Sequence, residues 1–294
     1  MTNKIRIGGV PEHFNYLFKL AKDLGLYKKY NVDVEFIIQS CGTGAMIKSL
    51  KDNELDVIIA LTEGLVTDIA KGSDIKLFGT YVNSPLCWAA SAGNDSNLNS
   101  INDLKGKTFG VSRYGSGSHL MAYVLAIQNN WNLDNDLNFK VVGNFEKLRN
   151  SINNKETDGF LWETFTTKPY HDSGEVKRIG DITTPWPCFM MASLNNSLKD
   201  KSELIKSAFQ AVNEAAYIFK NDKNMPTIIA KEYNLKYEDA KTWYNNVDII
   251  SNHNISKKAL ETTLVTLKQT GILNKDNKTT INDLVSIDIV NLTN

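Results

Sequence analysis

The first kind of candidate binding site is the turn Arg113-Tyr114-Gly115-Ser116-Gly117-Ser118, which combines glycines with serine hydroxyl groups. Glycine lets a backbone approach a ligand closely, and a helix that starts at such a turn presents free N–H groups to an anion or a carbonyl. A tight strand-to-helix turn with a serine cap needs the same residues. The composition of the turn therefore leaves both interpretations open.

Two glutamates follow strand-like runs and form the second kind of candidate. Glu63 lies between Thr62 and Gly64 after an apolar stretch, and Glu163 follows Trp162. A carboxylate accepts hydrogen bonds from an amine or amidine, and a neighbouring ring stacks on a flat heterocycle. The alternatives are a first-turn glutamate that complements a helix dipole and a tryptophan that belongs to the core.

Patterns for catalysis or metal binding are not found. The four histidines lack metal-ligand spacing, and the three cysteines are too far apart for a zinc site, so we expect buried free thiols. Ser116 is not in a Gly-x-Ser-x-Gly elbow, and no base with an orienting acid is recognisable beside it. We therefore expect no catalytic residue, no metal and no cofactor. Among the histidines, His13 is expected near the ligand, whereas His171 and His253 are expected to be solvated.

The elements that must position these residues alternate between short β-rich runs and helical stretches. This rhythm predicts an α/β protein with largely parallel sheets and helices on both faces. No internal repeat is visible, and Thr43, Ser202 and Ser256 are expected helix caps. The expected strands are 4–10, 32–39, 56–61, 75–81, 108–112, 139–142, 159–162 and 176–179. The expected helices are 15–28, 43–50, 62–71, one from the serine turn to Asn129, 145–153, 202–220, 226–233, 237–244 and 256–270.

Two extended apolar passages, 84–92 and 185–194, indicate that the chain enters a second lobe and returns. We expect lobe one to comprise 1–88 and 190–294, with the C-terminal helices, and lobe two to comprise 89–189. Two such connections make a hinge, and a cleft between α/β lobes is a common ligand site.

Composition narrows the classes of partner. The 294 residues suit two domains, and 33 basic residues balance 33 acidic ones, which argues against nucleic-acid or anionic-membrane binding. No run approaches the roughly 20 apolar residues of a membrane span. The first residues enter a strand without the apolar core of a secretory signal, so we expect a cytoplasmic protein.

Taken together, the segments resemble the type II periplasmic-binding-protein superfamily, in particular its nitrate-, sulfonate-, taurine- and thiamine-pyrimidine-precursor-binding branch, in a cytosolic, fungal-type version. Each segment alone is an ordinary α/β join, whereas their order and spacing are specific for the fold. The segments that carry the resemblance are Gly8-Gly9-Val10-Pro11-Glu12-His13, Leu24-Gly25-Leu26-Tyr27-Lys28-Lys29-Tyr30-Asn31-Val32-Asp33-Val34, Gly42-Thr43-Gly44, Leu55-Asp56-Val57, Ile101-Asn102-Asp103-Leu104-Lys105-Gly106-Lys107-Thr108-Phe109-Gly110-Val111 and Thr157-Asp158-Gly159-Phe160-Leu161-Trp162-Glu163.

One branch of the superfamily is an enzyme, the fungal thiamine-pyrimidine synthase, which consumes an active-site histidine and uses a cysteine-rich iron site. This sequence departs from it. The stretch around Cys188 has one cysteine rather than a run, and the segment 58–63 lacks the lysine and histidine that would hold a pyridoxal-type substrate. The resemblance therefore favours a binding protein over a synthase or an acyl-transfer hydrolase.

The resemblance implies a two-lobed solute-binding protein that closes on a small polar molecule. We expect a thiamine-pyrimidine-type nitrogen heterocycle, with a small anion (sulfonate, nitrate or carboxylate) as the alternative, and a protein partner that reads the closed form as a further possibility. Ligands of parallel sheets bind at the carboxyl ends of strands and at helix N-termini. The expected ligand-binding residues are Glu12, His13, Thr43, Gly44, Thr62, Glu63, Ser84, Trp88, Ser112, Arg113, Gly115, Ser116, Gly117, Ser118, Trp162, Glu163 and Trp186.

Overall fold

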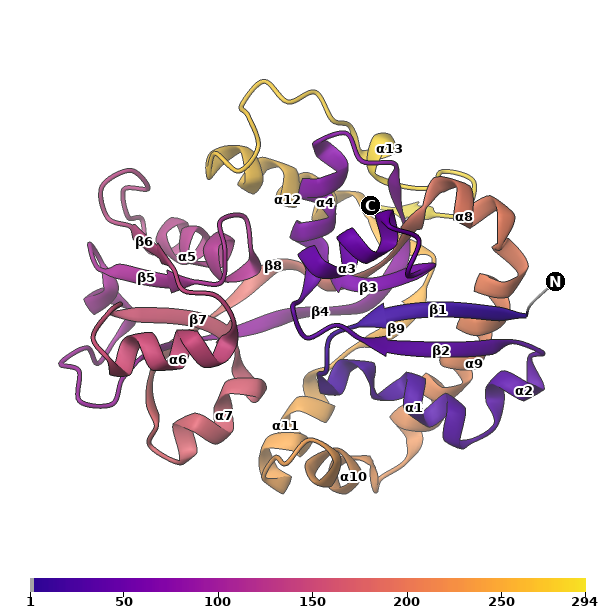
Figure 1. Ribbon diagram of the computed structural model, residues 1–294, viewed down its shortest axis with the longest axis horizontal. Helices are drawn as coiled ribbons and strands as arrows, with labels where there is room; N and C mark the ends of the chain where they lie inside the picture. The colour runs from indigo at the N-terminus through magenta and orange to yellow at the C-terminus, as the bar shows by residue number, and fades with distance from the viewer. Residues whose placement is uncertain (1–2) are drawn as a thin grey trace. The chain divides into compact units, whose positions relative to one another are not determined.

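The structure is a computed structural model that describes residues 3–294. The chain divides into two compact units (Figure 1). Unit 1 runs to Ser84 and resumes over Trp186–Leu264 and Asp276–Asn294, whereas unit 2 comprises Pro85–Pro185 and Val265–Lys275. The boundaries expected from the sequence lie at 88 and 190, and they assign 265–275 to the first lobe.

Unit 1 contains parallel strands at its N-terminal side and helices from both ends of the chain. Strand β1 pairs in parallel with β2 and with β3, and β3 pairs antiparallel with the end of β8. The strands are β1 Lys4–Gly9, β2 Asp33–Ile38, β3 Val57–Leu61, β9 Ile249–Asn252, β10 Asn254–Ser256 and β11 Asn291–Thr293. The helices are α1 Tyr16–Asp23, α2 Leu26–Lys29, α3 Thr43–Lys51, α4 Thr62–Ala70, α8 Asn195–Asp200, α9 Ser202–Asn221, α10 Met225–Glu232, α11 Tyr237–Asn246 and α13 Ile281–Leu284.

Unit 2 has the same kind of order over a shorter length. Strand β5 pairs in parallel with β6 and β7, and β7 pairs antiparallel with the second part of β4. Its elements are β5 Thr108–Val111, α5 Gly117–Gln128, β6 Asn138–Val141, α6 Phe145–Asn153, β7 Gly159–Glu163 and α7 Thr164–Asp172. The elements that pass from one unit to the other are β4 Ile75–Gly93, β8 Val176–Leu194 and α12 Lys257–Gln269.

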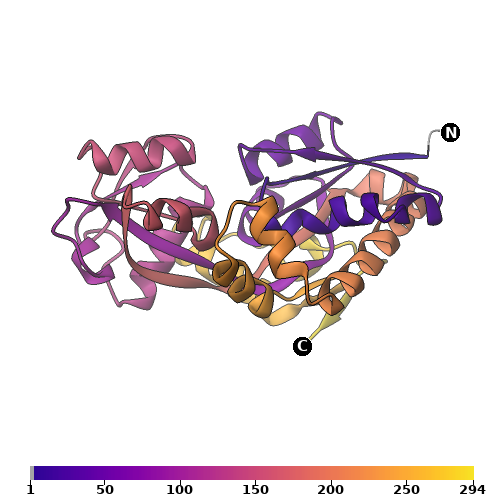
Figure 2. The same cartoon turned by 90° about the horizontal axis from the view of Figure 1, so that it is seen from below.

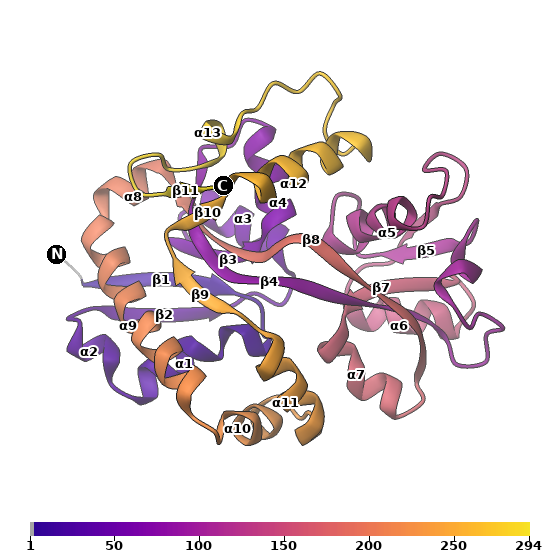
Figure 3. The same ribbon diagram turned by 180° about the vertical axis from the view of Figure 1, so that it is seen from behind.

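Both faces of the sheet in unit 1 are covered by helices. Helix α9 packs against α1 and α2 on one face, and α3 and α4 pack together on the other (Figures 1 and 3). In Figure 3 strand β9 runs beside β4, where Thr80 is in register with Asn252. The strand β3 is buried on both faces, since Val57, Ile58, Ile59 and Ala60 have no exposed surface. A short apolar run with turn residues after it is typical of such a strand, and the strand expected over 56–61 agrees with β3.

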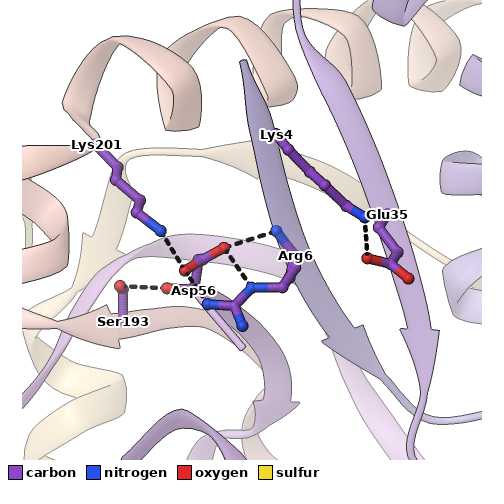
Figure 4. Close-up of polar contacts among 6 residues, drawn as sticks. All are labelled: Lys4, Arg6, Glu35, Asp56, Ser193 and Lys201. Atoms are coloured by element: carbon purple, nitrogen blue, oxygen red, sulfur yellow. Dashed lines mark hydrogen bonds and ion pairs between the residues drawn. The ribbon is translucent and has the colours of Figure 1, made fainter. Parts of the chain in front are cut away.

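A buried carboxylate fixes the amino end of β3, away from the strand ends that carry the candidate site. Asp56 accepts hydrogen bonds from the backbone N–H of Arg6 (2.8 Å), from its guanidinium and from Lys201 (2.6 Å) (Figure 4). Burial would raise the pKa of Asp56, but these bonds outweigh it and hold the pKa below its usual value. Asp56 therefore joins β1 to β3 and ties both to the beginning of α9.

Two units without visible sequence repetition nevertheless share one local plan. Asp158 accepts the backbone N–H of Thr108 at 2.8 Å, fifty residues away along the chain, and Asp56 accepts that of Arg6 across the same separation. In both units the aspartate precedes a strand that leads directly into a helix. The repeated feature is a hydrogen bond between an aspartate side chain and a backbone N–H fifty positions earlier, and the residues around it are not repeated.

The local expectations that were wrong concern helix ends and burial. Helix 15–28 is split, because Gly25 adopts a left-handed φ of 69° between α1 and α2. Thr43 and Ser202 are first helical residues and not caps, whereas Ser256 does accept the N–H of Ala259. Of the free cysteines only Cys188 is buried, since Cys87 is half-buried and Cys41 exposed.

Candidate functional site

Three of the expected turns of unit 1 lie at one edge of its sheet. The turns follow β1, β2 and β3, and β1 pairs in parallel with both neighbours. Parallel strands bring their carboxyl ends to the same edge. The structure therefore brings together Glu12 and His13, Thr43 and Gly44, and Thr62 and Glu63 as the sequence predicted.

Glu63 is the most unusual residue of this edge. It lies in the first turn of α4 and only 2% of its surface is exposed. Its Oε2 accepts the indole N–H of Trp186 at 2.9 Å, whereas its Oε1 has no hydrogen-bond partner within residues 3–294. Burial raises the pKa of Glu63 to about 7, although its own backbone N–H and Trp186 oppose the shift. A buried carboxylate oxygen without a donor costs free energy that a ligand N–H would recover.

Thr62 and Thr43 hold this glutamate in place. The hydroxyl of Thr62 donates to the backbone oxygen of Pro187, which fixes the start of α4 against β8. The Oγ1 of Thr43 accepts the N–H of Leu61 at 3.2 Å. A Cβ on Gly64 would lie 2.6 Å from the methyl carbon of Thr43, so α3 and α4 approach each other closely here. Both threonines therefore position Glu63 through backbone contacts, while Gly44 and Glu12 are half-buried at the same edge.

His13 lies in an aromatic environment and is 3% exposed. Its ring stacks on Phe14 at 4.7 Å between centroids and meets Trp243 edge-on at 4.4 Å. Burial lowers the pKa of His13 to about 3, so the ring is uncharged at neutral pH. It cannot act as a cationic anchor for an anion.

Sequence reasoning missed two buried residues beside His13. Asn15 is 5% exposed, and its amide donates to the backbone oxygen of Val10 at 2.8 Å. Trp243 of α11 is 3% exposed and packs against Phe14 as well, at 5.6 Å between centroids. Figure 2 shows the orange helices α10 and α11 beside the indigo α1. A polar residue just after a strand could have indicated Asn15, whereas nothing local connects Trp243 with a turn 230 residues earlier.

The serine turn of unit 2 forms a closed hydroxyl cluster. Ser116 caps α5 by accepting the N–H of His119 at 3.3 Å, and its hydroxyl lies 2.7 Å from the backbone oxygen of Arg113. Ser118 lies 3.0 Å from Ser116 and accepts the N–H of Ser112 at 3.1 Å. These contacts support the interpretation of Ser116 as the cap of helix α5. The backbone at Gly115 has a φ of 75°, and the exposed Arg113 and Gly115 leave the surface of the turn open.

The other expected residues of unit 2 lie on neighbouring strands. Trp88 of β4 is in register with Glu163 of β7. Glu163 is 3% exposed, its Oε2 accepts the N–H of Thr166 at 2.6 Å and the hydroxyl at 2.8 Å, and burial raises its pKa. Trp88 is 4% exposed, and its Nε1 has no partner in the part of the chain that the structure describes. The ring of Trp162 stacks on that of Phe145, with 5.1 Å between centroids, and packs against the core cluster of unit 2. These contacts support the interpretation of Trp162 as a core residue.

Of the two histidines expected in solvent, His253 is exposed as predicted, whereas His171 is half-buried. The Nε2 of His171 lies 2.9 Å from the hydroxyl of Ser91, and burial lowers the pKa of His171 to about 4. The Nδ1 of His253 lies 2.8 Å from the backbone oxygen of Phe78. The spacing of the histidines in the sequence does not predict these contacts with Ser91 and Phe78.

Unit 1 also contains a hollow of about 530 Å³. It is lined by the end of α9, by α11 and by the beginning of β9, including Lys220, Tyr244 and Asp248. Ser84, an expected ligand residue, is close to this region, since its Oγ accepts the N–H of Asp248 at 3.2 Å. No group of three His, Cys, Asp or Glu side chains suited to a metal occurs within residues 3–294. Over the same residues, no helix is both long and apolar enough to cross a bilayer.

The arrangement of strands and helices in the two units is that of the periplasmic-binding-protein fold. The model of the Ca3427-like periplasmic-binding-protein family matches residues 88–182. The solved structure of the Candida albicans CA3427 gene product is 34% identical, with a TM-score of 0.88 over 99% of this chain and 98% of that one. Its description states that it defines a new family with the generic periplasmic binding protein fold. The chain belongs to this Ca3427-like family, as the resemblance to the superfamily predicted.

More distant solved structures share the fold. The alkanesulfonate-binding protein SsuA from Xanthomonas axonopodis pv. citri, bound to MOPS, is 14% identical with a TM-score of 0.77, covering 99% of both chains. The nitrate-binding protein NrtA from Synechocystis PCC 6803 is 15% identical with a TM-score of 0.71, covering 99% of this chain and 86% of that one. No match was found among curated protein sequences.

Proposed function

We propose that this protein binds a small polar solute reversibly through hydrogen-bond donors of the solute, and that the solute is a nitrogen heterocycle of the thiamine-pyrimidine type. The observation that carries the proposal is the buried Oε1 of Glu63, which lacks a donor within the described residues. An amino or amidine group supplies that donor, and a positively charged one gains a charge-assisted bond. The aromatic rings of Phe14 and His13 in the same unit suit a flat ligand.

The test compares Glu63→Gln with the wild type. Native mass spectrometry of the freshly purified protein identifies a retained ligand, and calorimetry then measures its affinity. We expect Glu63→Gln to weaken binding by about tenfold or more, because glutamine presents a neutral amide where the ligand needs a carboxylate. Glu203→Gln, an exposed first-turn glutamate of α9, is the matched control and should bind as the wild type does. Equal affinity in the wild type and Glu63→Gln would exclude Glu63 from binding.

A small anion at the serine turn is the second candidate. The N-terminus of α5 and the exposed Arg113 favour it. The names of SsuA, an alkanesulfonate-binding protein, and NrtA, a nitrate-binding protein, support the same chemistry. Methanesulfonate, nitrate and acetate should then raise the melting temperature of the wild type, and Arg113→Gln should reduce that rise. A melting temperature unchanged by all three anions counts against this candidate.

The proposal includes a non-catalytic role, a cytoplasmic location and a partner protein that reads the bound state. SsuA and NrtA are binding proteins by name, which supports the first point. The thiols of Cys41, Cys87 and Cys188 are free, which fits a reducing compartment. Cell fractionation tests the location, and incubation with pyridoxal phosphate and iron, followed by mass analysis of His13 and His119, tests for synthase activity.

A further inference from the structure

Several buried polar atoms of unit 1 have no hydrogen-bond partner within residues 3–294, and three of them belong to residues near the His13–Asn15 turn, the end of β3 and helix α11. These three are Oε1 of Glu63, Oδ1 of Asn15 and Nε1 of Trp243. The three residues are 2%, 5% and 3% exposed. Native proteins satisfy most buried polar groups, so three unsatisfied ones at one end of a sheet require an explanation.

The elements that carry these residues meet around one side chain, Phe14, through ring contacts and strand pairing. Asn15 follows Phe14 in the short 3₁₀ turn His13–Asn15 after β1. The Phe14 ring lies 5.6 Å from that of Trp243 and 5.1 Å from that of Phe189. Phe189 is in register with Leu61, two residues before Glu63. The carboxyl ends of β1 and β3 and the helix α11 thus converge on this ring.

The chemistry of the three atoms is complementary to one pattern of ligand groups. Glu63 and Asn15 offer acceptors, and the indole N–H of Trp243 is a donor. Amines without a ring acceptor would leave Trp243 unsatisfied, and heterocycles without an amino group would leave both oxygens unsatisfied. His13, in edge-on contact with Trp243, adds an uncharged ring and no charge that would select an anion.

We propose that Glu63, Asn15 and Trp243 form the recognition site for a planar heterocycle that carries an amino group next to a ring nitrogen. The amino group donates to the oxygens of Glu63 and Asn15, and the ring nitrogen accepts from Trp243. This inference rests on the proposed function for the part played by Glu63. It adds Asn15 and Trp243 as binding residues, so that helix α11, which carries Trp243, contributes to the selectivity for the ligand.

The three atoms are closed off from water in the structure. A ligand reaches them when α11 moves away from the His13–Asn15 turn. The contacts that α11 would release there are aromatic, from Trp243 to His13 and to Phe14. Satisfying all three atoms repays the loss of these contacts, since each unsatisfied polar group costs free energy in the closed, empty state.

The test uses three small uncharged probes near neutral pH: 4-aminopyrimidine, aniline without ring nitrogens, and pyrimidine without the amino group. Ligand-observed NMR measures their affinities for the wild type and Trp243→Phe, which removes the N–H and keeps an aromatic ring. We expect the wild type to prefer 4-aminopyrimidine over both analogues by about tenfold. In Trp243→Phe the preference over aniline should be lost, while the affinity for aniline stays unchanged.

Trp131→Phe, a buried tryptophan of unit 2, is the matched control and should keep the wild-type preference. Melting temperatures and circular dichroism confirm that each variant is folded. An undiminished preference in folded Trp243→Phe overturns the role of Trp243 while the proposed function stands. Failure of the proposed function has a different signature, in which any retained ligand binds the wild type and Glu63→Gln equally.

Discussion

The indole Nε1 of Trp186 donates a 2.9 Å hydrogen bond to Oε2 of Glu63, from 123 positions further along the chain. Trp186 is the first residue after the chain returns to unit 1, and Glu63 lies in the first turn of α4. The bond occupies one oxygen of a buried carboxylate, and the other oxygen has no hydrogen-bond partner within residues 3–294. This bond and the hydrogen bond from the Thr62 hydroxyl to the backbone oxygen of Pro187 therefore link the returning chain to the start of α4.

The Trp186 bond predicts different effects for the same substitution at two tryptophans. Trp186→Phe removes the side-chain donor to Oε2 of this buried carboxylate, so we expect a loss of about 1–3 kcal/mol of unfolding free energy. Trp88→Phe removes an indole N–H that has no acceptor within the described residues, so it should be nearly neutral or stabilising. Urea unfolding of both variants measures the difference. Equal losses in the two would mean that ring size, and not the hydrogen bond, determines the effect.

Glu63 should make the ligand-free protein less stable as the pH rises. Its folded-state pKa is raised from 4.5 to about 7, so between these values the folded state binds more protons than the unfolded state. The stability that this group provides is complete below pH 4.5 and is lost as the pH rises through 7, about 3 kcal/mol in all.

The difference between wild type and Glu63→Gln isolates this contribution. Glutamine does not titrate, so the variant should gain stability relative to the wild type between pH 5 and pH 8. Denaturant unfolding at both values, with Glu203→Gln as the exposed control, measures the gain. A pH-independent difference between wild type and Glu63→Gln would contradict a raised pKa.

His13 should have the opposite dependence. Its folded-state pKa is lowered from 6.5 to about 3, so between these values the unfolded state binds more protons. Stability from this group is therefore complete above pH 6.5 and is lost as the pH falls towards 3. His13→Phe should be less sensitive than the wild type between pH 7 and pH 5, and unfolding curves at both values test this.

The strand ends of unit 1 show what the sequence could and could not reveal. An apolar run followed by Thr62 and Glu63 is a local signal, so the third strand, its helix and the glutamate were predictable. The contact of Glu63 with Trp186, and that of His13 with Trp243, join residues far apart in sequence, and no local pattern encodes them. The serine turn was also predictable, but its closed hydroxyl cluster depends on side-chain directions that spacing does not give.

The close approach of α3 to α4 predicts a destabilising substitution at Gly64 and a second substitution, at Thr43, that compensates for it. Gly64 has no left-handed φ, and a Cβ there would lie 2.6 Å from Cγ2 of Thr43. Gly64→Ala should therefore destabilise the protein by about 1–3 kcal/mol through overpacking, despite the better helix propensity of alanine. Thr43→Ser removes that methyl carbon and keeps the oxygen that accepts the N–H of Leu61. The double variant should recover most of the loss in thermal or urea unfolding. No recovery would mean that the strain lies in the backbone of α4, and then the threonine methyl does not set the position of Glu63.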